Sequence, residues 1–95
     1  MTKKIILNYL NQHKSEYKEK FGIEKIGLFG SYARDEATDK SDIDIVIEMN
    51  PKNLQKRLML KKELEQALKS SIDIGYFSSL RNFVANEIKK EIIYV

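Results

Sequence analysis

Residues 30–44 read Gly30-Ser31-Tyr32-Ala33-Arg34-Asp35-Glu36-Ala37-Thr38-Asp39-Lys40-Ser41-Asp42-Ile43-Asp44. The apolar residues before this stretch predict a strand over 24–30 that ends at the glycine, and residues 31–36 predict one or two helical turns. After a polar connection, polar and apolar side chains alternate over 42–48, which predicts a second strand. The stretch therefore joins a glycine–serine bend at the end of one strand to two aspartates at the start of another.

Long helices are predicted before and after this stretch. Apolar residues recur at three- and four-residue steps over 2–20, and Gly22 stands where a glycine commonly ends a helix. A second helix begins after Asn53, whose side chain can cap it, and runs to about Lys69. The side chains expected on the buried face of this second helix are Leu54, Leu58, Leu64, Ala67 and Leu68.

The last quarter of the chain predicts a strand, a helix and a β-prone tail. The strand covers 71–77, and the helix begins at Ser78 or Ser79. Residues 92–95 form either a short edge strand or a segment packed on the core. The side chains expected on the buried face of this last helix are Leu80, Phe83, Val84 and Ile88.

Helices and strands thus alternate along the 95 residues, which predicts one α+β domain over 1–95 with a sheet of at least three strands. The connection between the first two strands has about a dozen residues. That length is generous for an antiparallel return and near the lower limit for a parallel crossover. The relative direction of these two strands is therefore open.

The composition excludes several classes of protein. The chain has no cysteine, which rules out disulfides, zinc–thiolate sites and thiol nucleophiles and fits a reducing cytoplasm. No apolar run approaches the ~18 residues that a membrane span requires. The net charge is +3, but the lysines alternate with glutamates, which argues against direct nucleic-acid binding. The basic stretch Lys56, Arg57, Lys61 and Lys62 is either a solvated helix face or a docking surface for an acidic partner.

Three aspartates are candidates for a shared site. Asp42 and Asp44 lie two residues apart on a strand, so they share one face about 6.5–7 Å apart. If the strand over 71–77 lies beside theirs, Asp73 comes within about 5 Å laterally. Carboxylates this close repel unless protons or cations neutralise them. Two magnesium ions some 3.5–4 Å apart fit such a triangle.

Simpler interpretations apply to these residues taken singly. One aspartate at the start of a strand often only caps a turn, but Asp42 with Asp44 after a glycine–serine bend is a more specific pattern. Asp73 lies between isoleucines, so it is expected to be an unpaired charge in a core strand, where a ligand would offset its cost. His13, the single histidine, lies on the apolar side of its helix and is interpreted as packing.

The glycine–serine bend predicts a phosphate site. Gly30 lets a backbone approach a phosphate closely, and the helical turn that begins near Ser31 directs N–H groups towards it. Arg34 lies about one helical turn further on, where it reaches a phosphate or pairs with an aspartate. Tyr32 lies inside the same loop and could border a base or a sugar.

The two segments Gly30-Ser31-Tyr32-Ala33-Arg34 and Ser41-Asp42-Ile43-Asp44 closely resemble the signature of the polymerase-β-like nucleotidyltransferases. The short chain with a third aspartate near its end resembles the minimal nucleotidyltransferase branch. The resemblance spans nearly the whole chain and implies a polymerase-β-like palm, with a small mixed sheet flanked by helices. Asp35 departs from the pattern, because many members carry glycine there, and it adds a negative charge beside the phosphate loop.

The resemblance also implies roles for single residues. Gly30 and Ser31 would hold a nucleotide triphosphate, and Arg34 matches the signature without a fixed role. Asp42 and Asp44 would bind the metal ions. The third carboxylate of the site, near the acceptor hydroxyl, would be Asp73.

Members of this branch are commonly encoded beside HEPN-domain proteins and act with them as antitoxin and toxin. The resemblance therefore implies Mg-ATP-dependent transfer of AMP to a tyrosine of a HEPN ribonuclease toxin. One alternative is a non-catalytic binding module that neutralises its partner by contact. Another is nucleotidyl transfer to a small molecule or an RNA end. Nucleotide preference and oligomeric state do not follow from the sequence.

Overall fold

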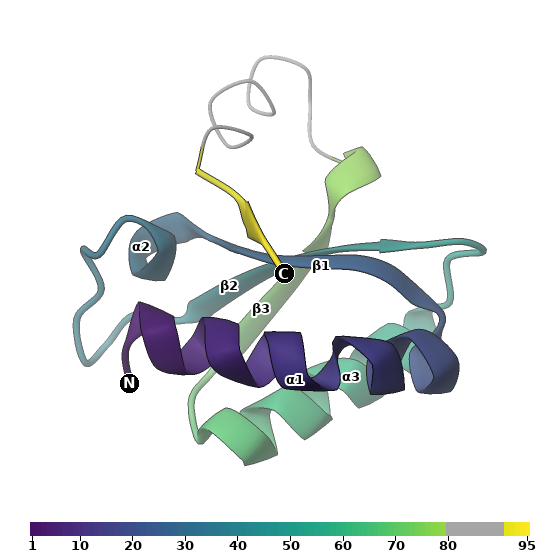
Figure 1. Cartoon of the computed structure of the whole chain (residues 1–95), viewed down its shortest axis with the longest axis horizontal. Coiled ribbons are helices and arrows are strands. Elements are labelled where there is room, and N and C mark those ends of the chain that lie inside the picture. Colours follow the sequence, from purple (N-terminus) through teal and green to yellow (C-terminus); the bar gives the residue numbers. More distant parts are fainter. Residues whose placement is uncertain (80–90) are drawn as a thin grey trace.

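A four-stranded sheet forms the centre of the molecule in the computed structural model, which describes residues 1–79 and 91–95. The strands lie in the order β3-β2-β1-β4, and β1 runs antiparallel to both of its neighbours while β2 and β3 run parallel (Figure 1). The first two strands therefore form an antiparallel pair, and the sheet is mixed. The strand bounds are Ile23–Phe29 (β1), Ile43–Met49 (β2), Ile72–Tyr76 (β3) and Ile93–Tyr94 (β4).

Two long helices, α1 (Lys3–Phe21) and α3 (Leu54–Leu68), cover one face of this sheet (Figure 1). The side-chain oxygen of Thr2 accepts a hydrogen bond from the Ile5 N–H at 3.2 Å and caps α1. Gly22 ends α1 with φ +71°, in the left-handed region that favours glycine. Asn53 caps α3 by accepting from the Lys56 N–H at 2.9 Å. The predicted caps of both helices are confirmed.

The core lies between these helices and the sheet. It is built from alternating strand residues and from helix residues at three- and four-residue spacing, because those periods place side chains on one face. β2 contributes Ile43, Ile45 and Ile47, α1 contributes Ile6, Leu10, Tyr17 and Phe21, and α3 contributes Leu60, Leu64 and Leu68.

The predicted buried face of α3 is only partly right. Leu64 and Leu68 are buried, but Leu54 and Leu58 are 60% and 52% exposed, and Ala67 is exposed. At 3.6 residues per turn, Leu58 lies about 160° around the helix from the buried Leu60. The buried residues of α3 follow the spacing i, i+4 and i+8 from Leu60. The large apolar side chains of Leu54 and Leu58 therefore face outward.

The segments beyond β3 were predicted less completely. A short 3₁₀ turn, η1 (Phe77–Ser79), follows β3. The last predicted helix, with Leu80, Phe83, Val84 and Ile88, lies outside the described residues. The tail forms the edge strand β4, one of its two predicted states, and it approaches so closely that a Cβ on Gly27 would lie 3.0 Å from Ile92 Cγ2. Among residues 1–79 and 91–95, no helix combines the length and hydropathy of a membrane span.

Candidate functional site: three carboxylates beside a glycine bend

The strand pairing of β2 and β3 brings the predicted aspartates to one face of the sheet. Asp44 and Asp73 are direct register partners in this parallel ladder, so their side chains project to the same side. Asp42 precedes Asp44 by two residues and lies just before β2, and at this end of the ladder the Ile43 N–H donates to the carbonyl of Ser71, the residue before β3, at 2.9 Å. β3 therefore lies next to β2, the condition on which the predicted triangle depended.

The three carboxylates influence one another through their charge. The pKa of Asp44 is raised, first because the group is partly buried and then because the negative charges of Asp73 and Asp42 oppose its ionisation. The positive charge of Arg34 acts in the opposite direction. Asp44 thus lies at the centre of the acidic group and gains most from a cation.

Asp73 differs from its expected environment. It is exposed, not buried, because side chains alternate along β3: Ile72 and Ile74 are buried, and Asp73 between them projects to the opposite face of the sheet. The argument that a buried charge needs a ligand does not apply to it. Its place in the site depends on its register with Asp44, and its exposure leaves it accessible to a second molecule.

Gly30 lies in direct contact with the Asp44 side chain. Gly30 has φ +75°, and a Cβ built there would overlap Asp44 Oδ2 and lie 3.0 Å from Asp44 Cγ. No other residue type fits both the backbone conformation and the space. The structure therefore places the glycine–serine bend against the carboxylates.

The helical turn after this bend, α2 (Gly30–Ala33), is shorter than the predicted 31–36. With four residues its macrodipole is weak, so it adds little to the phosphate attraction that the sequence predicted for this bend. Ser31 is partly exposed at this end. Tyr32 is buried in the core, so it is not available to border a base or a sugar.

Arg34 has partners that the sequence did not indicate. Its Nε lies 3.2 Å from Glu36 Oε2 and its Nη1 lies 3.0 Å from Glu91 Oε2. Both partners are glutamates, so within the described residues the guanidinium does not pair with one of the three site aspartates. These contacts tie the end of α2 to the residues that enter β4.

The departure at Asp35 has a structural explanation. Asp35 has φ +59°, the left-handed region in which glycine is unstrained and aspartate is tolerated better than most residues. Its carboxylate lies 2.8 Å from Lys3 Nζ. The added negative charge is therefore paired with a lysine of α1.

Magnesium was predicted from the donor set, and the donor chemistry fits. Carboxylate oxygens are the ligands that Mg²⁺ prefers, and the pKa of Asp44 is raised first by burial and then by the negative charges of Asp73 and Asp42, which a cation would offset. Within the described residues, however, no three acidic or histidine side chains converge closely enough to hold one metal ion as they lie. Mg²⁺ is commonly held by one or two carboxylates together with phosphate and water oxygens, so a three-carboxylate cluster is not a condition for binding.

The cavities of the described residues lie mostly elsewhere. One cavity of about 510 Å³ is lined by α1, β1 and the tail and includes none of the three aspartates. A cavity of about 100 Å³ lies between α3 and β3, and Asp73 is one of its lining residues. His13 is packed as predicted, since its ring stacks on that of Tyr9 at 4.0 Å and its Nδ1 lies 2.8 Å from the Tyr9 carbonyl oxygen.

Sequence reasoning missed several residues around the site. Lys3 and Glu91, the partners of Asp35 and Arg34, are 32 and 57 residues away along the chain. No local spacing signals such pairs. Of the residues that line the cavity beside Asp73, Arg57 and Lys61 could be recognised only as part of a basic stretch, and Leu58 was predicted on the buried face of the helix.

Comparison with known proteins gives a consistent result. The sequence profile of the nucleotidyltransferase domain matches residues 10–95. Protein adenylyltransferase MntA of Thermococcus cleftensis is 38% identical over 96 residues, which cover 100% of this chain and 97% of that protein.

Two solved structures share the fold. One, described as a minimal nucleotidyltransferase, superposes with a TM-score of 0.82 at 24% identity and covers 98% of this chain and 95% of that one. The other is from a toxin–antitoxin with AMP-PNP, with a TM-score of 0.71 at 23% identity over 88% of this chain and 69% of that one.

Proposed function

This chain belongs to the nucleotidyltransferase family and, within it, to the branch of protein adenylyltransferase MntA, and on that premise we propose that it transfers AMP from Mg-ATP to a tyrosine of a cognate HEPN ribonuclease toxin. The transfer silences the toxin, so the chain acts as an antitoxin. One domain over residues 1–95 carries the reaction, which takes place in the cytoplasm, where ATP and the toxin are found. The observation that carries the proposal is the contact of Gly30 with Asp44, which joins a phosphate-binding bend to a carboxylate pair.

The reaction is a substitution at the α-phosphorus of ATP. The bond from the tyrosine oxygen to that phosphorus forms, the bond to the pyrophosphate oxygen breaks and pyrophosphate leaves, and the hydroxyl proton passes to solvent water. Two Mg²⁺ ions would neutralise the negative charge on the phosphates and on the attacking oxygen. Gly30 and Ser31 hold the triphosphate through the bend, while Asp42 and Asp44 hold the metal. Asp73, exposed at the sheet edge, orients the acceptor hydroxyl and completes the metal ligands.

Three observations support a protein acceptor. The relative MntA is named a protein adenylyltransferase, and a structure with the same fold comes from a toxin–antitoxin with AMP-PNP. The cavity beside Asp73 is about 100 Å³ in the described residues, well below the ~300 Å³ or more that encloses a drug-sized molecule. An acceptor held on the surface by a second protein fits this geometry better than a small molecule held in a pocket.

The test uses ATP labelled at the α-phosphate and the purified product of a neighbouring HEPN reading frame. We expect label to appear on a tyrosine of that protein in the presence of Mg²⁺. Asp44→Asn should reduce the rate by at least about 100-fold, because it removes the central metal ligand. Asp39→Asn is the matched control. Asp39 is an exposed carboxylate in the connection between α2 and β2, and it is not one of the three site aspartates. Absence of transfer by the wild type, or equal rates for both variants, would contradict the proposal.

The alternative of a non-catalytic antitoxin has one observation in its favour. The described carboxylates do not converge on a metal position as they lie. A module that acts by contact alone would neutralise the toxin equally well with Asp44→Asn. The catalytic proposal expects the ribonuclease to stay active with that variant, so a ribonuclease assay distinguishes the two functions.

A further inference from the structure

One stripe of α3 lies beside the third carboxylate of the proposed site. Leu54, Arg57, Leu58 and Lys61 follow the i, i+3, i+4, i+7 spacing that places residues on one helix face. Leu54 and Leu58 expose 60% and 52% of their surface, although large apolar side chains usually lie inside a domain of this kind. We call these four residues the α3 stripe.

The α3 stripe continues into the site through the small cavity. Arg57, Leu58 and Lys61 line it from the helix, and Asp73 and Ile74 line it from β3. A molecule that covers the stripe therefore reaches the edge of β3, the strand that carries the carboxylate that we place next to the acceptor hydroxyl. β3 lies at one edge of the sheet, so no further strand of the described sheet covers its outer side next to the stripe.

The two cations of the α3 stripe lie near Asp73, which lines the same cavity, but they form no ion pair with it or with another described carboxylate. Within residues 1–79 and 91–95, neither Arg57 nor Lys61 takes part in an ion pair. The guanidinium of Arg57 instead lies over the Tyr76 ring at 5.1 Å, which holds it in a fixed position. Two cations beside two exposed leucines match a partner surface that has apolar side chains at its centre and carboxylates around them.

From this arrangement we propose that the α3 stripe is the docking surface for the acceptor protein. The partner presents an apolar patch to Leu54 and Leu58 and acidic side chains to Arg57 and Lys61, which brings its acceptor hydroxyl to Asp73. The inference rests on the proposed function for the identity of the partner. The two leucines favour a protein over a nucleic acid, because phosphate contacts need cations but no apolar neighbours.

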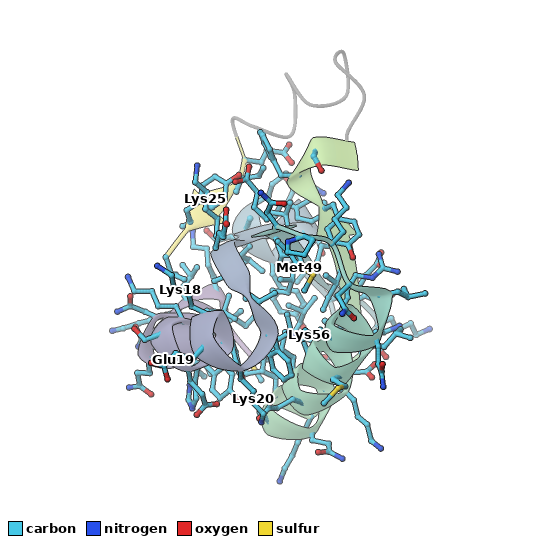
Figure 2. The ribbon with its side chains drawn as sticks, turned by 90° about the vertical axis from the view of Figure 1, so that its right-hand side faces the viewer. Lys18, Glu19, Lys20, Lys25, Met49 and Lys56 are labelled. Carbon is cyan, nitrogen blue, oxygen red and sulfur yellow. The ribbon has the colours of Figure 1, made fainter. Side chains whose placement is uncertain are left out.

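The test compares two charge-reversal variants. Arg57→Glu with Lys61→Glu changes the stripe, and Lys14→Glu with Lys18→Glu changes the rim of the 510 Å³ cavity by the same charge. Figure 2 shows that Lys18 and Lys25 lie on the side of the molecule that carries β4, whereas α3 lies on the opposite side. The control therefore alters a separate surface.

Two affinities are measured by calorimetry for each variant, for Mg-ATP and for the purified product of the HEPN reading frame without nucleotide. We expect the stripe variant to lose at least about tenfold in affinity for that protein and to keep its affinity for Mg-ATP, while the control keeps both. Leu54→Ser with Leu58→Ser should also weaken partner binding, without any change in charge. Thermal unfolding checks that each variant is folded.

Several results would overturn the inference. If both charge variants bind the partner as the wild type does, the stripe is not the docking surface, whether or not AMP transfer occurs. A matching loss of Mg-ATP affinity would assign Arg57 and Lys61 to the nucleotide site. Binding of an RNA oligonucleotide that the stripe variant loses would indicate a nucleic-acid acceptor. Partner binding needs no catalysis, so these results stay distinct from a failure of the proposed transfer.

Discussion

Gly30 and Asp44 occupy adjoining space, so that a Cβ on the glycine would overlap the Oδ2 atom of the aspartate. The bend at the end of β1 and the carboxylate on β2 therefore depend on each other's position. The antiparallel pairing of Phe29 with Asp44 keeps them together, because it brings the last residue of β1 opposite that aspartate.

Gly30→Ala should damage both the fold and the site. The backbone at φ +75° disfavours a side chain by about 1–2 kcal/mol, and the overlap with Asp44 adds to this. We expect a fall in Tm of roughly 5–10 °C and a loss of Mg-ATP binding. The control is Gly75→Ala in β3, where a Cβ meets nothing within 4 Å. Equal effects in the two variants would show that the contact with Asp44 has no importance.

Asp35→Ala and Asp35→Gly should differ in stability. Alanine keeps the strain of the left-handed backbone at φ +59° and loses the ion pair with Lys3, so we expect it to destabilise the protein by about 1 kcal/mol. Glycine loses the same exposed ion pair but removes the strain, so its change should stay within about 0.5 kcal/mol. Urea denaturation of both variants measures the difference. A glycine variant less stable than the alanine variant would contradict this account.

Arg34→Gln should loosen the tail and leave nucleotide binding intact. The guanidinium pairs with Glu36 and Glu91, and no phosphate role is needed to explain its position. We expect faster amide hydrogen exchange at the β4 residues Ile93 and Tyr94 and a change in Mg-ATP affinity of less than about twofold.

Glu91→Gln is the matched variant for the same contact. It removes one partner of Arg34 and should produce the same increase in exchange at β4. If Arg34→Gln instead abolishes Mg-ATP binding while Glu91→Gln does not, the arginine has the phosphate role that the signature left open.

Features set by near neighbours could be predicted from the sequence. Gly22 and Asn53 end and begin their helices through contacts with residues three or four positions away. The alternation of β2 predicted that Asp42 and Asp44 share a face, and the adjacency of β3 then placed Asp73 with them.

Features that depend on distant contacts could not be predicted. Which stripe of α3 is buried depends on how the sheet meets the helix, so Leu58 was assigned to the wrong side and Leu60 was missed. The partner of Arg34 is 57 residues away, and no periodicity connects the two. The sequence pattern likewise treated β3 as a core strand, because alternation does not distinguish an edge strand from a central one.

Asp44→Asn should raise stability at neutral pH even though it removes the central carboxylate of the site. The folded-state pKa of Asp44 lies above its unfolded value, so the fold disfavours the ionised form. This penalty is present above the folded-state pKa and disappears as the pH falls through it towards the unfolded value. The group is only partly buried, so solvent screening limits the gain to roughly 0.5 kcal/mol, or about 2–4 °C in Tm.

Thermal unfolding of both proteins at neutral and at acidic pH checks the sign. We expect the advantage of Asp44→Asn over the wild type at pH 7 to vanish near pH 3, where both side chains are neutral. Asp39→Asn should show no such dependence, because Asp39 is exposed and belongs to no acidic cluster. Added Mg²⁺ should reverse the order at pH 7, since it stabilises the wild type through the carboxylates and leaves the variant nearly unchanged. An equal response of both proteins to Mg²⁺ would show that the ion binds away from Asp44. The ionised Asp44 would then destabilise the fold with no bound cation to offset it.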